Sequence, residues 1–243
     1  MKNNRIIYSL FLALGIVIGC QNTPSTPNAP TPDQAPTSPD KVLPVFANYY
    51  IRYIEDDRLL RAEASFKEGE NASKSQPITF KGGVAFMSSG MQAKKLNEQL
   101  IRYEYLQKVD FPKDEFRFNF KDKKEQEHLF NIGLTPIVDF EVKKASISSG
   151  LRIDLKTEPL TSDETLIAIL TDTNGNPTTI EQKGPTETSI IQFSLQPHQS
   201  SLSPGKATIS LIRKKTKRSK KDNYNHSATA EYYSKPKNLS IIP

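Results

Sequence analysis

The highest density of charge in the chain lies between residues 213 and 221, where the sequence reads RKKTKRSKK. Lysine and arginine at this density attract anionic groups such as lipid phosphates, lipopolysaccharide or a polyanionic glycan. Nucleic acid is a poor fit, because no aromatic residue is interleaved to stack on bases. The alternative is a solvated loop whose charges keep a strand end soluble and unpaired. The candidate anion-binding residues are Arg213, Lys214, Lys215, Lys217, Arg218, Lys220 and Lys221.

Three histidines, His128, His198 and His226, are the candidates for metal binding or acid–base chemistry. None lies two or four positions from another, so the sequence has no zinc-ligand spacing. A Ser-His-Asp triad stays open, because triads assemble from distant positions, but no Gly-x-Ser-x-Gly elbow accompanies it and Ser88-Ser89-Gly90 is a poor substitute. We therefore predict that the protein is not an enzyme and has no catalytic residue, metal site or cofactor.

The segment Asp172-Thr173-Asn174-Gly175-Asn176 has two interpretations. Its oxygen-bearing side chains are of the type found in calcium loops, but such a loop needs an acidic residue at its far end, and Glu181 is the nearest. Asn-Gly between two strands is also a strong hairpin signal. We interpret the segment as a turn.

The chain has a single cysteine, Cys20, and the residues before it follow a clear order. Two basic residues in MKNNR precede a mostly apolar run from Ile6 to Ile18, and Val17-Ile18-Gly19-Cys20 closes it. A secretory signal has this layout, with charged residues first, then an apolar run and then small residues. A membrane-spanning helix needs about 20 apolar residues, and this run is too short.

Val17-Ile18-Gly19-Cys20 resembles the lipobox of bacterial lipoproteins. The resemblance implies cleavage between Gly19 and Cys20, a diacylglyceryl group on the Cys20 sulfur and a fatty acyl chain, such as palmitate, on the new amino group. Two or three acyl chains anchor a protein stably. An acylated Cys20 leaves no thiol for a disulfide or for nucleophilic catalysis. Gln21, where inner-membrane lipoproteins of enteric bacteria tend to have Asp, favours the outer membrane, on its periplasmic face or at the cell surface.

Residues 20–42 follow the predicted signal peptide of residues 1–19, and Gln21 to Asp40 is rich in proline and lacks large apolar side chains. Such a segment cannot bury enough surface to fold, and proline biases it towards extended geometry. We predict a disordered tether that reaches at most about 60 Å, at ~3.1 Å per residue.

Beyond the tether, apolar residues recur at every second position, which predicts β-strands. Tyr49, Ile51 and Tyr53, then Leu60 to Phe66, flank an acidic turn and predict a hairpin. The same alternation is found in residues 101–105, 116–120, 151–155, 191–195, 207–211 and 228–232. Leu166–Leu170 is apolar throughout, which predicts a strand buried on both faces. Only Met91–Leu100 looks helical.

The segment Leu202–Leu211, LSPGKATISL, resembles the turn-and-strand corner of immunoglobulin-like β-sandwiches, although the usual corner tyrosine is missing. The break at Gly133–Pro136 separates two strand series. We predict an all-β fold with two antiparallel, immunoglobulin-like β-sandwich domains, residues 43–136 and 137–243. Whether these are separate or one continuous sandwich stays open.

The whole chain is similar to envelope lipoproteins with immunoglobulin-like modules and no assigned role. We expect a non-enzymatic binding or structural module held at the cell envelope. One alternative is an anionic glycan or lipopolysaccharide binder using residues 213–221, and a second is an envelope hydrolase with a dispersed triad. The expected partners are the membrane, through the lipid anchor, and envelope proteins or anionic glycans, but not nucleic acid. The oligomeric state stays open.

Overall fold

The computed structural model describes residues 42–113, 115–194 and 202–243. The predicted signal peptide, Cys20 and the tether up to residue 41 lie outside the described residues. Within them the fold is all-β, as predicted, with one short 3₁₀ helix, η1 (Ala72–Lys74). The strands are β1 (Val45–Ile54), β2 (Leu59–Gly69), β3 (Ser75–Pro77), β4 (Val84–Phe86), β5 (Ser89–Gly90), β6 (Gln92–Asn97), β7 (Leu100–Lys108), β8 (Phe116–Lys121), β9 (Glu127–Ile132), β10 (Phe140–Ser146), β11 (Gly150–Leu155), β12 (Glu164–Asp172), β13 (Pro177–Lys183), β14 (Ile190–Phe193), β15 (Gly205–Lys221), β16 (Tyr224–Tyr233) and β17 (Lys237–Ile241).

The predicted first hairpin is present as β1 and β2. Alternate residues of both strands are buried, and Ile51 of β1 lies opposite Ala62 of β2 in an antiparallel register. The residues between them on each strand are partly exposed. One face of this hairpin is therefore apolar and the other is polar, which is the pattern of a sheet covered on one side.

The largest sheet has the strand order β13-β12-β15-β16-β1-β2-β7-β6, with β17 also paired to β15 and β3 to β2. β1 and β16 are parallel and pair from Val45↔Tyr224 to Ile54↔Tyr233, whereas the neighbouring β1–β2 and β15–β16 pairs are antiparallel. The sheet is therefore mixed, where the sequence analysis expected purely antiparallel pairing. Parallel partners need a long connection, and these two strands come from opposite ends of the folded chain.

Two smaller sheets, β5-β4-β8-β9 and β10-β11-β14, complete the fold. Aromatic rings join the first of them to β1 and β2. The Tyr49 ring lies 4.6 Å from that of Phe118 and 4.5 Å from that of Phe130, and Phe66 lies 4.8 Å from Phe120. Ring pairs at these distances stabilise the core beyond the area they bury. This packing brings β9 alongside the second half of β15.

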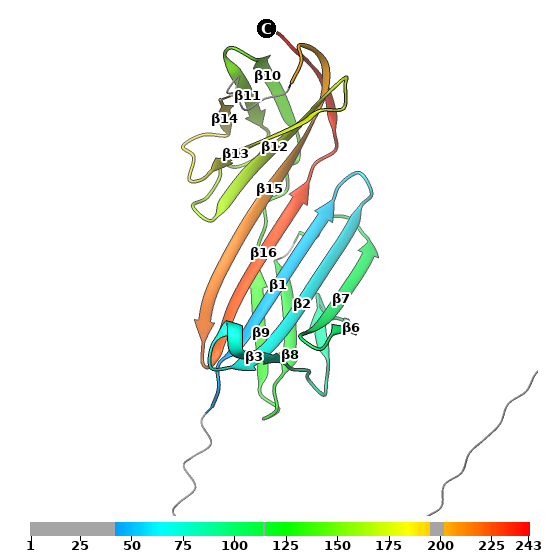
Figure 1. Cartoon of the computed structure of the whole chain (residues 1–243), viewed down its shortest axis with the longest axis vertical. Helices are drawn as coiled ribbons and strands as arrows, with labels where there is room; N and C mark the ends of the chain where they lie inside the picture. The colour runs from blue at the N-terminus through cyan, green and yellow to red at the C-terminus, as the bar shows by residue number, and fades with distance from the viewer. Residues whose placement is uncertain (1–41, 114, 195–201) are drawn as a thin grey trace, which may run out of the picture. The chain divides into compact units, whose positions relative to one another are not determined.

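β15 is the longest strand, and it pairs with three other strands, β12, β16 and β17 (Figure 1). Its first part pairs with β12 on one edge and with β17 on the other, and from Ile212 onwards it pairs with β16. β16 belongs to the second predicted domain, and it pairs with β1 of the first. The large sheet therefore continues across the predicted domain boundary at residue 136. The two-domain division stays a prediction.

Two local predictions were wrong. Met91–Leu100 is not helical: Gln92–Asn97 is the exposed edge strand β6, which pairs with β7 through its backbone, from Gln92↔Glu104 to Asn97↔Leu100. Leu166–Leu170 is an interior strand of the sheet but is buried on one face only, since Ile167 and Ile169 are partly exposed. In the described part of the chain, no helix has the length and apolar character needed to span a bilayer.

Candidate anion-binding surface on strand β15

The basic segment is a strand, whereas the sequence analysis considered a solvated loop there. Residues 212–221 pair with β16 in an unbroken antiparallel register that ends at Lys221↔Tyr224, next to the turn at Asp222 and Asn223. Apolar alternation stops at Ile212, which is why the sequence suggested that the strand ended there. Backbone pairing continues because main-chain N–H and C=O groups, and not apolar side chains, form the ladder.

Arg213 does not lie on the surface, contrary to the sequence prediction. Its side chain is fully buried, and Nη2 donates to Glu164 Oε2 at 2.6 Å. Nη1 donates to the Glu158 carbonyl and Nη2 to that of Pro159, both at 3.1 Å. Burial raises the pKa of Glu164, but the hydrogen bonds from Arg213 and from the Thr161 N–H, together with the Arg213 charge, outweigh it and hold the pKa of this carboxyl below its usual value. Arg213 is therefore occupied inside the fold and is not available to an external anion.

The next basic residues are also partly engaged. Lys215 is half-buried, with Nζ 3.6 Å from Asp163 Oδ2. Lys217 donates from Nζ to the Asn131 carbonyl of β9 at 2.7 Å and lies 5.5 Å from the centre of the Phe130 ring. Lys214 is half-buried and lies beside Glu231 in the sheet register. Lys215 and Lys217 thus each have a contact within the fold, although Lys217 remains exposed and still presents its charge to solvent.

Arg218, Lys220 and Lys221 are exposed, and none forms an ion pair with a carboxylate of the described residues. Arg218 and Lys220 share one face of the sheet, because they alternate along β15. Lys221 lies on the other face, opposite buried Tyr224. Two of the seven predicted residues are thus brought together as free cations on one surface.

That surface is built from two rows that cross three neighbouring strands. Asn48 of β1, Ser227 of β16 and Arg218 of β15 are in register in the first row. Phe46, Asn225 and Lys220 are in register in the second. The rows are two residues apart on each strand, which is roughly 7 Å, and the strands span roughly 10 Å from β1 to β15.

A groove of about 450 Å³ lies over these rows, with Ala72 of η1 at its side. Its floor provides amide and hydroxyl groups, and one edge provides two cations. Phe46 adds a partly exposed ring. This combination suits a ligand that carries both hydroxyls and negative charge. Sequence reasoning missed Asn48, Asn225 and Ser227; the polar positions that alternate with buried residues in β1 and β16 were the available signal.

The histidines are not gathered into one site. His128 Nε2 lies 3.1 Å from Asp122 Oδ2, and His226 Nδ1 lies 3.1 Å from the Tyr49 hydroxyl. Both rings are buried among aromatic side chains, and burial, followed by the charges of His128 and Lys221, lowers the pKa of His226 to about 4. His198 lies outside the described residues. Neither described ring is hydrogen-bonded to a serine or threonine hydroxyl of the described residues.

The segment Asp172–Asn176 is the predicted turn, between β12 and β13, with Gly175 at φ +80°. Asp172 Oδ1 accepts the N–H groups of Asn174 and Asn176, each at 2.9 Å, and Oδ2 accepts that of Ser203 at 3.2 Å. Its oxygens thus bind protein amides. Among the described residues no three His, Cys, Asp or Glu side chains are grouped as metal ligands would be.

No protein-family model and no curated protein matches this chain. Among solved structures, it is similar to a crystal structure of a tetra-tandem repeat in the extending region of a large adhesion protein. The identity is 11%, the TM-score is 0.26, and the match covers 81% of this chain and 49% of the other. This chain therefore spans about half of that structure's length, and no conclusion rests on so low a score.

Proposed function

We propose that the protein is a lipid-anchored lipoprotein of the bacterial cell envelope whose folded part is a non-enzymatic module that binds an anionic glycan. The anchor is acylated Cys20, and the predicted location is the outer membrane, on its periplasmic face or at the cell surface. The lipobox Val17-Ile18-Gly19-Cys20 supports this part of the proposal. Two immunoglobulin-like β-sandwiches around the shared strand β15 are the proposed architecture.

The observation that carries the ligand proposal is the pair of rows ending in Arg218 and Lys220. Cations without a carboxylate partner attract an anion without first breaking an ion pair. The Asn48 and Asn225 amides offer donors and acceptors for sugar hydroxyls, and the Phe46 ring offers an apolar surface. A lipid phosphate or a peptide carboxylate would use the cations but would leave the polar floor unused.

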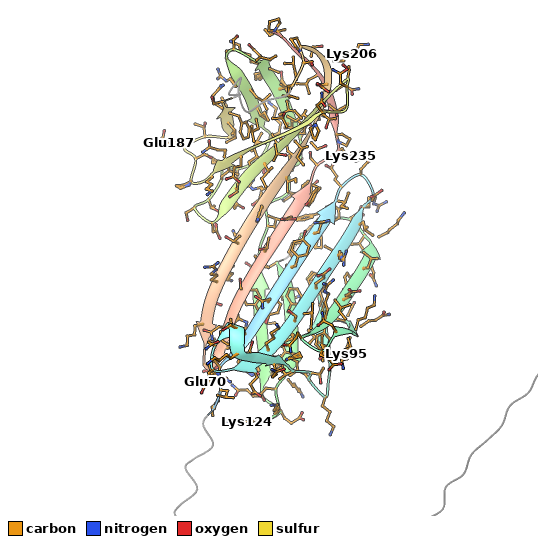
Figure 2. The ribbon with its side chains drawn as sticks, viewed as in Figure 1. Glu70, Lys95, Lys124, Glu187, Lys206 and Lys235 are labelled. Carbon is orange, nitrogen blue, oxygen red and sulfur yellow. The ribbon has the colours of Figure 1, made fainter. Side chains whose placement is uncertain are left out.

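Retention of the full chain on an immobilised glycan tests this proposal. Polygalacturonate carries the carboxylates, and dextran provides the uncharged comparison. The double variant Arg218→Glu, Lys220→Glu should lose retention on polygalacturonate, while the wild-type protein should pass through dextran freely. Lys206→Glu is the matched control, since Lys206 is an exposed residue near the opposite end of β15 (Figure 2).

A second variant separates recognition from general charge attraction. Asn48→Ala with Asn225→Ala keeps both cations but removes the amides of the floor. We expect a several-fold loss of retention on polygalacturonate. If the double amide variant binds as well as wild type, the groove does not recognise the sugar. If the charge-reversed variant is retained like Lys206→Glu, the groove does not bind the polymer at all.

A further inference from the structure

The end of β15 has an open edge. On the β12 side, the strand pairs with β12 only as far as Lys215, and the Thr216 N–H then donates to the Asp163 carbonyl at 2.9 Å. On the other side, β16 pairs as far as Lys221. Within the described part of the chain, residues 217–221 therefore have a strand on one side only.

Main-chain alternation identifies the groups on this edge. In a strand, the N–H and C=O of one residue point to the same side, and those of the next residue point to the other. Since the Thr216 N–H points to the β12 side, the N–H and C=O groups of Arg218 and Lys220 point there too. The open edge thus presents two donors and two acceptors, over five residues or roughly 17 Å.

The side chains along this edge define which strand can join it. Lys217 and Lys221 lie on one face, Arg218 and Lys220 on the other, and Ser219 is the only uncharged residue among the five. Directly opposed like charges destabilise a strand pair and opposite charges stabilise it. A second copy of this edge is therefore repelled, whereas a strand with acidic side chains is attracted on both faces.

We propose that the Lys217–Lys221 edge of β15 receives an acidic, extended segment of another protein as an added β-strand. Main-chain hydrogen bonds to Arg218 and Lys220 provide the pairing, and the basic side chains select the partner. The segment 21–40 of this chain is not a suitable occupant, since its acidic residues are only Asp33 and Asp40 and it is rich in proline. The proposal goes beyond the glycan groove, because it depends on the strand's backbone.

Lysines on a strand edge also protect proteins against aggregation, so the test must detect pairing itself. The probe is a fluorescent, end-capped peptide of about seven alternating Glu and Val residues, titrated into the full chain and followed by anisotropy. Lys220→Gln removes the charge and keeps the N–H. Lys220→Pro removes the charge and the edge N–H, and an edge position tolerates proline because its N–H is not in the ladder.

An added strand predicts that Lys220→Gln weakens peptide binding by a factor of about two to five, and that Lys220→Pro weakens it at least tenfold further. Equal affinities for the two variants, or no binding of the peptide to wild type, would overturn the proposal and leave the lysines as protection only. Should Lys220→Pro fail to fold, a peptide N-methylated at its central residues replaces it, because it retains charge and cannot donate. Binding of this peptide as tightly as the parent would equally refute the added strand.

The same two variants also test the glycan proposal, and they do so independently of the added strand. Retention on polygalacturonate depends on side chains, so it should fall equally in Lys220→Gln and Lys220→Pro. A further loss of peptide binding in Lys220→Pro beyond that in Lys220→Gln then supports the added strand, whatever the result with the glycan.

Discussion

Arg213 and Glu164 form an ion pair in the interior of the fold, with Nη2 2.6 Å from Oε2 and both side chains sealed from solvent. The pair is incompletely satisfied, because Arg213 Nε and Glu164 Oε1 have no hydrogen-bond partner. Each buried charge therefore depends on the other for its compensation. The pair joins β12 to β15 just before the point where β15 loses β12 as its neighbour.

Replacing Arg213 with Met should lower the free energy of unfolding by about 3–5 kcal/mol, because it leaves Glu164 buried without its counter-charge. Urea unfolding followed by tyrosine fluorescence measures the change. The double variant Arg213→Met, Glu164→Leu should be more stable than Arg213→Met alone. Lys143→Met, which breaks the exposed pair with Glu141, is the control and should cost no more than about 1 kcal/mol. Additive losses in the double variant would show that the two charges do not depend on each other.

The stability of the protein should fall as the pH falls from about 6.5 to about 4. His226 has a pKa of about 4 in the fold, against about 6.5 in an unfolded chain. The unfolded state therefore binds more protons in this range, and the folded state loses up to about 3 kcal/mol. The groups around the ring are Tyr49 of β1, His128 of β9, Tyr224 on its own strand and Lys221 of β15.

Carboxylates also titrate near pH 4, so the informative quantity is the difference between wild type and His226→Gln. We expect the variant, which keeps an acceptor for the Tyr49 hydroxyl, to lose much less stability between pH 6.5 and pH 4. Urea midpoints at several pH values provide the comparison. If the urea midpoint falls equally with pH in the two proteins, His226 does not contribute to the acid sensitivity.

Calcium should leave the thermal midpoint unchanged, because Asp172 already uses its oxygens for amide donors. Hydrogen bonds from Asn176, Ser203 and Asn174 also hold the pKa of this carboxyl below its ordinary value. Asp172→Ala should lower the midpoint more than Thr173→Ala, an exposed change in the same turn. Differential scanning calorimetry with chelator and with millimolar calcium tests both statements, and a midpoint raised by calcium would favour the calcium-loop interpretation.

Replacing Cys20 with Ser should prevent acylation and release the protein from the membrane fraction. Because Cys20 is the only cysteine, no other thiol can take the lipid. Labelling of cells with a palmitate analogue, followed by fractionation, measures both effects. A Cys20→Ser protein that still carries the label or still sediments with membranes would contradict the proposed anchor.

The sequence predicted those elements whose burial follows a two-residue period. Tyr49, Ile51 and Tyr53 are buried as expected, because one face of β1 meets a second sheet. The same reasoning failed at Met91–Leu100 and at Arg213–Lys221. Both segments contain strand residues at a sheet edge, Gln92–Asn97 and residues 217–221, where backbone pairing holds residues whose side chains show no apolar alternation.

The candidate surface was only partly predictable for a different reason. Charge density pointed to Arg218 and Lys220, and Asn225 joins them through the β15–β16 hairpin, but Asn48 joins them only through the parallel pairing of β1 with β16. No local pattern encodes a pairing between strands so far apart in sequence. Arg213 was misplaced for the same reason, since its partner Glu164 belongs to another strand and the sequence does not show which charge will be buried.

The parallel pairing of β1 with β16 has a mechanical consequence. β1 is the first strand of the fold and follows the predicted tether in the sequence, so the relevant load is the component of a pull that acts along the axis of β1. Because β1 is paired along its whole length with β16 on one side and β2 on the other, such a force loads the hydrogen bonds in shear. The hydrogen bonds must then yield together instead of unzipping one at a time, which raises the force needed to pull β1 out of the sheet.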